Sequence, residues 1–251
     1  MSAAGDFDRL VADAHADSWQ ALGELFAGRG GGTATHHGLR LMASGLPDAA
    51  WNSGDVSAAD ADIEAARTFY ESRGVPWGLR VPPWVRFRPG RRLTHQRLMG
   101  LRRPDFRARE APAGLSLALA SAADLEDVVR IDSEAFASDP AHGRPWLAAL
   151  LGAPADVVAV ALARSEGRAV GTGYAVSASS AAGSSVLIGG IAVIETQRER
   201  GIGGALSSWL VRHGFERARL AQLASDDDRA ARLYARLGFV ETAGHDIYID
   251  F

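Results

Sequence analysis

The sequence predicts an α+β fold in which mixed sheets are flanked by helices, divided into two tandem domains at residues 1–112 and 113–251. Two observations support this prediction. The chain has 251 residues, of which 47% are hydrophobic and 23% charged, which is enough for one large or two small cores. Segments with apolar residues at helical spacing also alternate with short segments of strand composition, most regularly after residue 113.

The first domain is the less regular of the two. Apolar periodicity predicts helices at about residues 6–27 and 58–73, the second beginning at a Ser57-Asp60 capping box, with a glycine-rich loop from Gly28 to Gly32 between them. We then expect, in chain order, a strand at 76–81, a helical turn at 93–99 and a linker at 107–114. This order weakly echoes that of residues 201–239, and either duplication or chance produces such an echo.

In the second domain the elements follow a definite order. A strand at 115–120 precedes a helix that begins at the capping box of Ser121 and Asp124, and Pro140, Gly143 and Pro145 then break the pattern. The elements expected after this break are strands at 157–164, 168–177 and 185–194, a helix at 201–217, a strand at 220–224, a helix at 226–237 after a third capping box at Ser225 and Asp228, and closing strands at 240–249.

Composition excludes several classes of enzyme. The chain contains no cysteine and no lysine, so all 27 of its basic residues are arginine. The missing cysteines exclude disulfides, thiolate zinc sites and cysteine nucleophiles. The missing lysines exclude Walker A loops and Schiff-base chemistry. Neither Gly-x-Ser-x-Gly nor His-Glu-x-x-His occurs, so the sequence does not indicate hydrolases of those kinds.

Charge and hydropathy bear on location and partners. The net charge of -3 is too small to indicate a polyanionic partner. The first thirty residues lack a basic start followed by an apolar core, and no segment approaches the roughly 18 apolar residues of a membrane span. We therefore expect a cytoplasmic protein with no membrane partner.

Arginines are densest between residues 80 and 109. Only Asp105 balances them in the run of ten, which consists of Arg80, Arg86, Arg88, Arg91, Arg92, Arg97, Arg102, Arg103, Arg107 and Arg109. Such a run is more often a solvated or ion-paired face than a nucleic-acid platform, and few stacking aromatics accompany it. We do not expect nucleic acid as the partner. Guidance of an anionic cofactor or an acidic acceptor is an alternative of similar weight.

The most informative segment runs from Ile191 to Gly204. An apolar strand that contains Ile191 and Val193 leads into Arg198-Glu199-Arg200-Gly201-Ile202-Gly203-Gly204, which opens an amphipathic helix. The first N–H groups of a helix have no partner within it and lie at the positive end of its dipole. The turn therefore predicts a cradle for phosphate. About thirty residues later the chain reads Arg232-Leu233-Tyr234-Ala235-Arg236-Leu237-Gly238-Phe239.

With Arg198-x-x-Gly201-x-Gly203 followed by Ala230, Tyr234 and Gly238-Phe239, the region from about residue 114 to 251 resembles the GNAT superfamily of N-acetyltransferases. The family's cofactor motif is Q/R-x-x-G-x-G/A, and its later motif resembles N-x-x-A-x-x-x-Y-x-x-x-G-F. The resemblance implies a GNAT-like acyl-CoA N-acyltransferase fold here and allows a degenerate GNAT-like copy in residues 1–112. It also implies acetyl-CoA as co-substrate and no metal.

The resemblance assigns roles to residues. Backbone groups near Ile191 and Val193 would hold the pantetheine arm and the acetyl carbonyl, where an N–H would stabilise the oxyanion. Tyr234 would be the catalytic acid that protonates the departing thiolate when an amine attacks directly in a ternary complex. The candidate cofactor-binding residues are Ile191, Val193, Arg198, Glu199, Arg200, Gly201, Ile202, Gly203, Gly204 and Asp227.

Three residues depart from the family's usual pattern. Glu195 stands where proline is common, Glu199 where glycine is common, and Asp227 where asparagine is common. Glu199 places a negative charge near the expected pyrophosphate, which Arg198 and Arg200 would offset. The strand at 185–194 carries no carboxylate, so the general base stays open among an ordered water and three side chains: Glu134, Asp139 and His142.

Several alternatives accompany this interpretation. The acceptor would be the primary amine of a small molecule or peptide, and the sequence leaves room for a homodimer. The first domain, whose glycine loop follows a helix, would shape the acceptor pocket without binding cofactor. A non-catalytic acetyl-CoA sensor or partner-binding module is the main functional alternative. Asp13, His15 and Asp17 are metal-ligand types, but helical spacing turns His15 away from both aspartates, and His36-His37 is expected at the surface.

Overall fold

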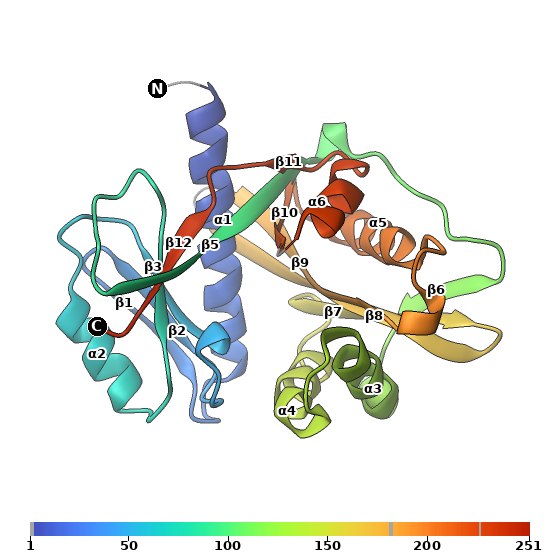
Figure 1. Cartoon of the computed structure of the whole chain (residues 1–251), viewed down its shortest axis with the longest axis horizontal. Coiled ribbons are helices and arrows are strands. Elements are labelled where there is room, and N and C mark those ends of the chain that lie inside the picture. Colours follow the sequence, from blue (N-terminus) through green and yellow to red (C-terminus); the bar gives the residue numbers. More distant parts are fainter. Residues whose placement is uncertain (1–2, 181–182, 226) are drawn as a thin grey trace. The chain divides into compact units, whose positions relative to one another are not determined.

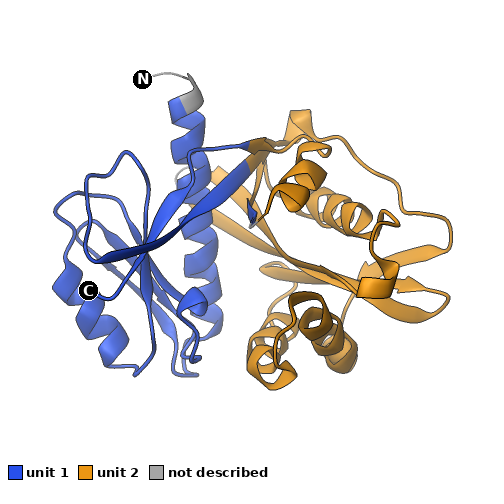
Figure 2. Ribbon diagram, viewed as in Figure 1, with its two compact units in different colours: residues 1–99, 224–226, 241–251 blue, residues 100–223, 227–240 orange. Residues whose placement is uncertain are grey.

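The computed structural model describes residues 3–180, 183–225 and 227–251, and the chain divides into two compact units (Figure 2). Unit 1 contains residues 1–99, 224–226 and 241–251, and unit 2 contains residues 100–223 and 227–240. The chain thus enters unit 2 along a strand and returns to unit 1 for its last strand. The limits of these units do not coincide with the domain boundary expected between residues 112 and 113. The division into domains at 1–112 and 113–251 remains a prediction.

Unit 1 is built on a six-stranded mixed sheet. Its elements, labelled in Figure 1, are α1 (Ala3–Leu25), β1 (Gly32–His36), β2 (Leu39–Ala43), β3 (Asn52–Val56), α2 (Ile63–Glu71), β4 (Gly78–Val81), β5 (Arg91–Arg102) and β12 (His245–Ile249). The strand order is β1-β2-β3-β4-β12-β5. The β3–β4 pair is parallel, and β1–β2, β2–β3, β4–β12 and β12–β5 are antiparallel.

The two faces of this sheet differ in chemistry. Successive side chains of a strand point to opposite faces, so Arg40 and Leu41 of β2 separate the two sides. Leu41 belongs to a buried apolar cluster with Phe69 and Tyr70 of α2. Arg40 instead pairs with Asp17 of α1, at 2.6 Å between Nη1 and Oδ1. Helix α2 therefore covers an apolar face, and α1 covers a face that carries charges.

Unit 2 contains a five-stranded sheet in the order β10-β9-β8-β7-β6. Its elements are β6 (Leu115–Leu119), α3 (Leu125–Phe136), α4 (Pro140–Leu151), β7 (Val158–Ser165), β8 (Arg168–Ser180), β9 (Gly183–Val193), α5 (Ile202–Gly214), β10 (Leu220–Ser225) and α6 (Asp228–Ala235), with β11 (Val240–Glu241) at its end. The pairs β6–β7, β7–β8 and β8–β9 are antiparallel, whereas β10 joins β9 in parallel.

Helices cover both faces of the unit 2 sheet. A Cβ placed at Gly171 or Gly173 of β8 would meet Leu206 or Leu210 of α5 at 2.9 and 3.2 Å, so α5 packs closely on that face. The intervening side chains of β8 point the other way, where α3 and α4 lie. Glycine on β8 thus lets α5 approach the sheet.

Most of the expected elements occur within a few residues of their predicted bounds, but two predictions are wrong. The helical turn expected at 93–99 is part of strand β5, which also removes one element from the suggested internal echo. The break expected after Pro140 is the helix α4. Its first residue is Pro140, whose missing N–H costs nothing there, and the side chain of Asp139 accepts from Ala141 N–H at 2.9 Å.

Two helix starts also differ from prediction. The N-cap of α2 is Asp62, and the N-cap of α6 is Asp227, whose side chains accept from Ala65 and Ala230 N–H at 3.0 and 2.7 Å. The Ser57 and Ser225 boxes therefore do not begin those helices, whereas Ser121 and Asp124 form theirs. Asp226, where the helix at 226–237 was expected to begin, lies outside the described residues. None of the helices within the described ranges is both long and apolar enough to cross a bilayer.

Candidate acyl-CoA site

A cavity of about 730 Å³ in unit 2 brings together most of the residues predicted for cofactor binding. Ten of the eleven candidates line it: Ile191, Val193, Arg198, Glu199, Gly201, Ile202, Gly203, Gly204, Asp227 and Tyr234. Arg200 is not among the lining residues. The lining residues that were not among these candidates are Arg109, Ala135, Phe136, Gln197, Arg229, Ala230, Arg232, Leu233 and Arg236.

One wall of this cavity is the start of α5. Gly201 is the N-cap in the left-handed conformation, with φ of 82°, which an L side chain rarely adopts. The first intrahelical bond runs from Ala205 N–H to the Gly201 carbonyl at 3.0 Å. The N–H groups of Ile202, Gly203 and Gly204 precede it, so they lack carbonyl partners within the helix. They present a positive, donor-rich end to the cavity.

Gly203 keeps this wall open. A Cβ at Gly203 would lie 3.5 Å from Leu233 and 3.8 Å from Val193, both ordinary van der Waals distances. The fold of the free protein therefore does not require glycine at this position. What glycine provides is room for another molecule to approach the backbone closely.

A second wall is strand β9, which is only partly paired on one side. Its parallel register with β10 joins Ser185, Val186 and Leu187 to residues 220–222. Beyond Leu187, β9 continues to Val193 with no further β10 partner in the described pairing, so backbone groups of its last residues are available along this edge. Ile191 and Val193 point from this part of β9 into the cavity.

Cations predominate around the cavity. Five arginines line it (Arg109, Arg198, Arg229, Arg232 and Arg236), against the two carboxylates of Glu199 and Asp227. Arg229 and Arg232 of α6 and its C-cap residue Arg236 follow one another at helical spacing, an arginine stripe that we did not predict from the sequence. An elongated anion with several phosphates fits both this charge and the helix start.

The family comparison agrees with this geometry. The model of the acetyltransferase (GNAT) family matches residues 125–239, which include α3, the turn, α5 and α6. This part of the chain is a GNAT domain. The prediction drawn from the two sequence motifs is thereby confirmed, and so is the α+β fold with helices on mixed sheets. The family and the fold are those of acyl-transferring enzymes. Among curated proteins, none matches this sequence.

Solved structures show the same fold over most or all of the chain. A GCN5-related N-acetyltransferase from Kribbella flavida is similar over 100% of this chain and 96% of its own, with 21% identity and a TM-score of 0.69. One from Sphaerobacter thermophilus covers 96% and 94%, with 17% identity and a TM-score of 0.57. A tandem GNAT protein from the clavulanic acid biosynthesis pathway covers 84% and 76%, with 17% identity and a TM-score of 0.52.

Glu199 and Arg198 of the GNAT domain behave differently from expectation. Glu199 pairs with Arg229 of α6 at 3.4 Å, where Arg198 and Arg200 were expected to offset its charge. The guanidinium of Arg198 donates to the carbonyls of Val193 and Ala135 at 3.2 and 3.0 Å, and its own N–H donates to Glu195. Arg198 thus ties the turn to β9 and α3, and the free N–H groups begin after it.

Tyr234 lies on α6 and is half-buried in the cavity wall. Its ring meets Phe239 edge to face, with ring centroids 5.9 Å apart, and Phe239 is buried. Gly238 between them has φ of 101°, and a Cβ there would lie 2.2 Å from the carbonyl oxygen of Asp105. The Gly-Phe pair of the GNAT motif therefore ends the helix and packs against the tyrosine. Asp227, besides lining the cavity, caps the same helix.

The three side chains suggested as general bases have structural roles or lie elsewhere. The carboxylate of Glu134 accepts the N–H of Glu195 at 3.0 Å, and that of Asp139 caps α4. His142 lies in the first turn of α4 and, like them, does not line the cavity. Nothing in these contacts distinguishes one of them as a base.

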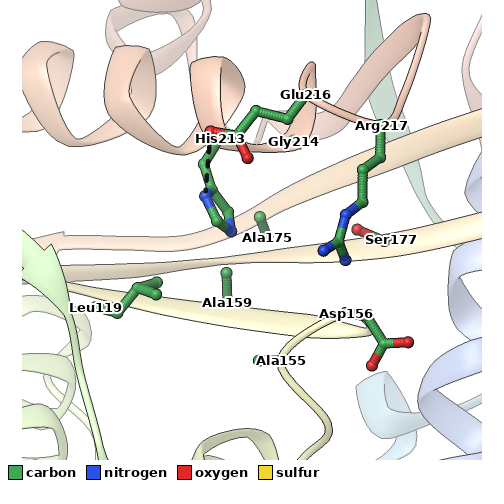
Figure 3. A pocket seen from close by; sticks show the side chains of 10 residues that line it. All are labelled: Leu119, Ala155, Asp156, Ala159, Ala175, Ser177, His213, Gly214, Glu216 and Arg217. Atoms are coloured by element: carbon green, nitrogen blue, oxygen red, sulfur yellow. Dashed lines mark ion pairs between the residues drawn. The ribbon is translucent and has the colours of Figure 1, made fainter.

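Another cavity of the GNAT domain, of about 400 Å³, lies at the opposite end of α5 (Figure 3). At its rim, His213 Nδ1 lies 4.0 Å from Glu216 Oε1. Leu119, Ala159 and Ala175 line its floor. Arg217 lines this cavity together with the carboxylates of Asp156 and Glu216, and the C-terminal end of α5 presents carbonyl groups, which do not bind phosphate. The chemistry of a phosphate cradle therefore belongs to the first cavity.

The histidines and aspartates of unit 1 have other partners. Arg40 pairs with Asp17 and Asp13, while the buried His15 accepts a hydrogen bond from Trp19 Nε1 at 2.9 Å. His37 pairs with Asp60 at the surface, at 3.0 Å. No group of three or more side chains placed to hold a metal ion occurs among residues 3–180, 183–225 and 227–251.

Proposed function

We propose that the protein is an N-acetyltransferase that moves an acetyl group from acetyl-CoA to a primary amine of a small molecule or peptide. The observation that carries this proposal is the helix start at Gly201–Gly204, which opens into a cavity lined by five arginines and by the unpaired edge of β9. Pyrophosphate requires such a combination of backbone donors and cations. We keep the cytoplasm as the proposed location.

The residues present fit acetyl-CoA in three respects. The N–H groups of Ile202, Gly203 and Gly204 and the arginines of α6 would hold its phosphates, and the edge of β9 at Ile191 and Val193 would hold its amide-containing arm by strand-like hydrogen bonds. When bound, acetyl-CoA supplies the thioester. Tyr234, which lines the same cavity, would give its hydroxyl proton to the leaving sulfur.

The main alternative is a sensor that binds acetyl-CoA without turnover. It is favoured by one observation: β9 carries no carboxylate that could serve as a base. Tyr234→Phe separates the two hypotheses, since an enzyme should lose about 100-fold or more in kcat with little change in affinity. A sensor would release no thiol from acetyl-CoA in either form with any amine.

Calorimetric titration of acetyl-CoA is the direct test of the cofactor site. We expect the wild type to bind and Gly203→Glu to lose binding, because the new side chain would enter the cavity and bring a negative charge to the helix start. Ser116→Glu is the matched control, since it adds the same charge at an exposed position of β6 outside the cavity. Equal binding by all three proteins, or by none, would refute the proposed site.

A further inference from the structure

Asp132 lies on the face of α3 that continues the wall of the acyl-CoA cavity. Ala135 and Phe136, three and four residues further along the helix, line that cavity. Residues at these spacings share one face of a helix. Asp132 therefore lies one helical turn before the part of α3 that lines the cavity.

Strand β9 reaches the same level from the cavity. Going back from Val193 and Ile191, β9 has an irregularity opposite Thr172–Tyr174, where Gly190 adopts a positive φ of 58°. A bulge of this kind interrupts the ladder and redirects backbone groups. The cavity wall formed by β9 thus ends in a distorted segment of backbone at Gly189 and Gly190.

Tyr174 connects this segment to Asp132. Its ring lies on the bulge, since Cβ atoms at Gly189 and Gly190 would both come within 2.6 Å of ring carbons. Its hydroxyl is hydrogen-bonded to the side chain of Trp146 of α4, and the charge of Asp132 acts on it. A Cβ at Gly143 of α4 would lie 3.5 Å from Asp132 Oδ2. The carboxylate of Asp132 on α3 therefore lies close to Gly143 of α4 and acts on Tyr174 of β8, whose ring packs on the β9 bulge.

The surroundings of this carboxylate lack a compensating charge. Burial alone raises the pKa of Asp132 to about 6, with no cation acting against it. Burial, with the charge of Asp132, raises the pKa of Tyr174 to about 12, so that hydroxyl stays neutral at physiological pH. The other acidic residues near the end of α3 differ, because Glu134 and Asp139 accept backbone N–H groups. Asp132 thus has a raised pKa, and its carboxylate has no hydrogen bond or ion pair among the described residues.

We propose that Asp132 is the general base of the acetyl transfer, an assignment that rests on the proposed function. The amine nitrogen forms a bond to the thioester carbonyl carbon, and the C–S bond breaks with its electron pair going to sulfur. Asp132 takes the proton that the nitrogen loses, and Tyr234 gives the proton that the sulfur gains. Exchange with solvent then restores both side chains. The acceptor amine would consequently approach the thioester from the side of the cavity that α3 lines at Ala135 and Phe136.

Asp132→Asn tests the assignment, with thiol release from acetyl-CoA as the readout. A polyamine, an aminoglycoside and a peptide with a free N-terminus serve as acceptors, and the one that is acetylated fastest is used for all variants. Asp132→Glu keeps the carboxylate, and Asp127→Asn is the matched control on the same helix, where the carboxylate pairs only with surface arginines. Calorimetry measures the acetyl-CoA affinity of each variant.

We expect Asp132→Asn to lose about 100-fold or more in kcat while acetyl-CoA affinity is unchanged. In the wild type, kcat/KM should rise with pH through about 6, because the ionised carboxylate is the active form, and this limb should vanish in Asp132→Asn. Asp132→Glu should recover part of the rate. An unchanged rate in Asp132→Asn, or an equal loss in Asp127→Asn, would overturn the assignment while the transferase stands. A wild type that acetylates none of the amines would overturn both.

Discussion

The two units contain turns of similar composition whose backbone N–H groups have different partners. Both have a turn rich in glycine and arginine, at residues 28–32 in unit 1 and 198–204 in unit 2. The first follows a helix, and its N–H groups at Arg29 and Gly31 donate to the carbonyl of Phe26 at 2.9 and 3.2 Å. The second precedes a helix, so its N–H groups have no such carbonyls to bond. Glycine content alone does not identify a site, whereas the direction of the adjoining helix does.

Charged groups show the same contrast. Arg80 in unit 1 is 3% exposed and binds both oxygens of Asp55, at 2.8 and 2.7 Å, with its guanidinium over the ring of Trp19. Asp132 in unit 2 is partly buried, and burial without a compensating cation raises its pKa. The charge of Arg80 is thus satisfied within unit 1, which stabilises a fold. In unit 2 we propose that the helix-start donors and Asp132 serve another molecule.

The largest predicted effect is that of Asp55→Asn in unit 1. Removing one charge of a buried pair leaves the other uncompensated, so we expect the free energy of unfolding to fall by about 3 kcal/mol. Urea denaturation at neutral pH measures the loss, and calorimetry should show unchanged acetyl-CoA affinity per folded molecule. A loss below about 1 kcal/mol would mean that the Arg80–Asp55 pair does not stabilise unit 1.

Glycine substitutions in the first turn should give a smaller loss. A Cβ at Gly31 would lie 2.4 Å from the carbonyl oxygen of Ala43, so Gly31→Ala should cost about 2 to 3 kcal/mol. Gly28→Ala is the matched control, because a Cβ at Gly28 would meet no atom within 4 Å. Alanine there would cost only about 1 kcal/mol, since an L residue disfavours the φ of 79°. Equal losses in urea denaturation would contradict a packing role for Gly31.

The sequence predicted those features of the fold and the site that depend on residues close together in the chain. The turn at 198–204 and the phrase around Tyr234 are contiguous, so motif and helix direction together predicted ten lining residues. Strand β5 was mistaken for a helical turn because its pairing partner β12, with Gln96 opposite His245, lies about 150 residues away. Asp132 was missed because its significance depends on Tyr174 and the β9 bulge. Only the fold brings these residues together.

Asp132→Asn should stabilise the protein where Asp55→Asn destabilises it. The pKa of Asp132 is raised from 3.8 to about 6, so folding favours its neutral form, and the stability that it contributes is lost as pH rises through about 6. Since asparagine carries no charge, we expect Asp132→Asn to gain about 1 to 2 kcal/mol at pH 8, discounted for partial exposure, and nothing below pH 4. Urea denaturation at the two pH values measures this difference. A loss at both would show that the carboxylate is structural.

Gly203→Ala sharpens the contrast between the two turns. Its Cβ meets only ordinary contacts, and alanine is preferred to glycine within a helix, so the free protein should be up to about 1 kcal/mol more stable. The same methyl group would stand between the backbone and a phosphate, and we expect acetyl-CoA to bind about 10-fold more weakly. Thermal denaturation measures the expected gain in stability, and calorimetry independently measures the expected loss of acetyl-CoA affinity. Unchanged affinity would show that the ligand does not approach Gly203.

The smallest effect concerns Glu199, the one residue of the second turn that brings a negative charge to the expected phosphate site. Glu199 has a positive φ of 67°, which costs a non-glycine residue about 1 kcal/mol, and its carboxylate reaches Arg229 at 3.4 Å across an exposed surface. Glu199→Gly should remove that strain and free Arg229 for the ligand, so we expect two- to fivefold tighter binding of acetyl-CoA at low salt. Glu199→Gln removes the charge but keeps the side chain. If both variants gain equally, charge is the cause, and if only the glycine variant gains, the backbone is. Weaker binding by either would mean that the Glu199–Arg229 pair holds α6 in place for the ligand.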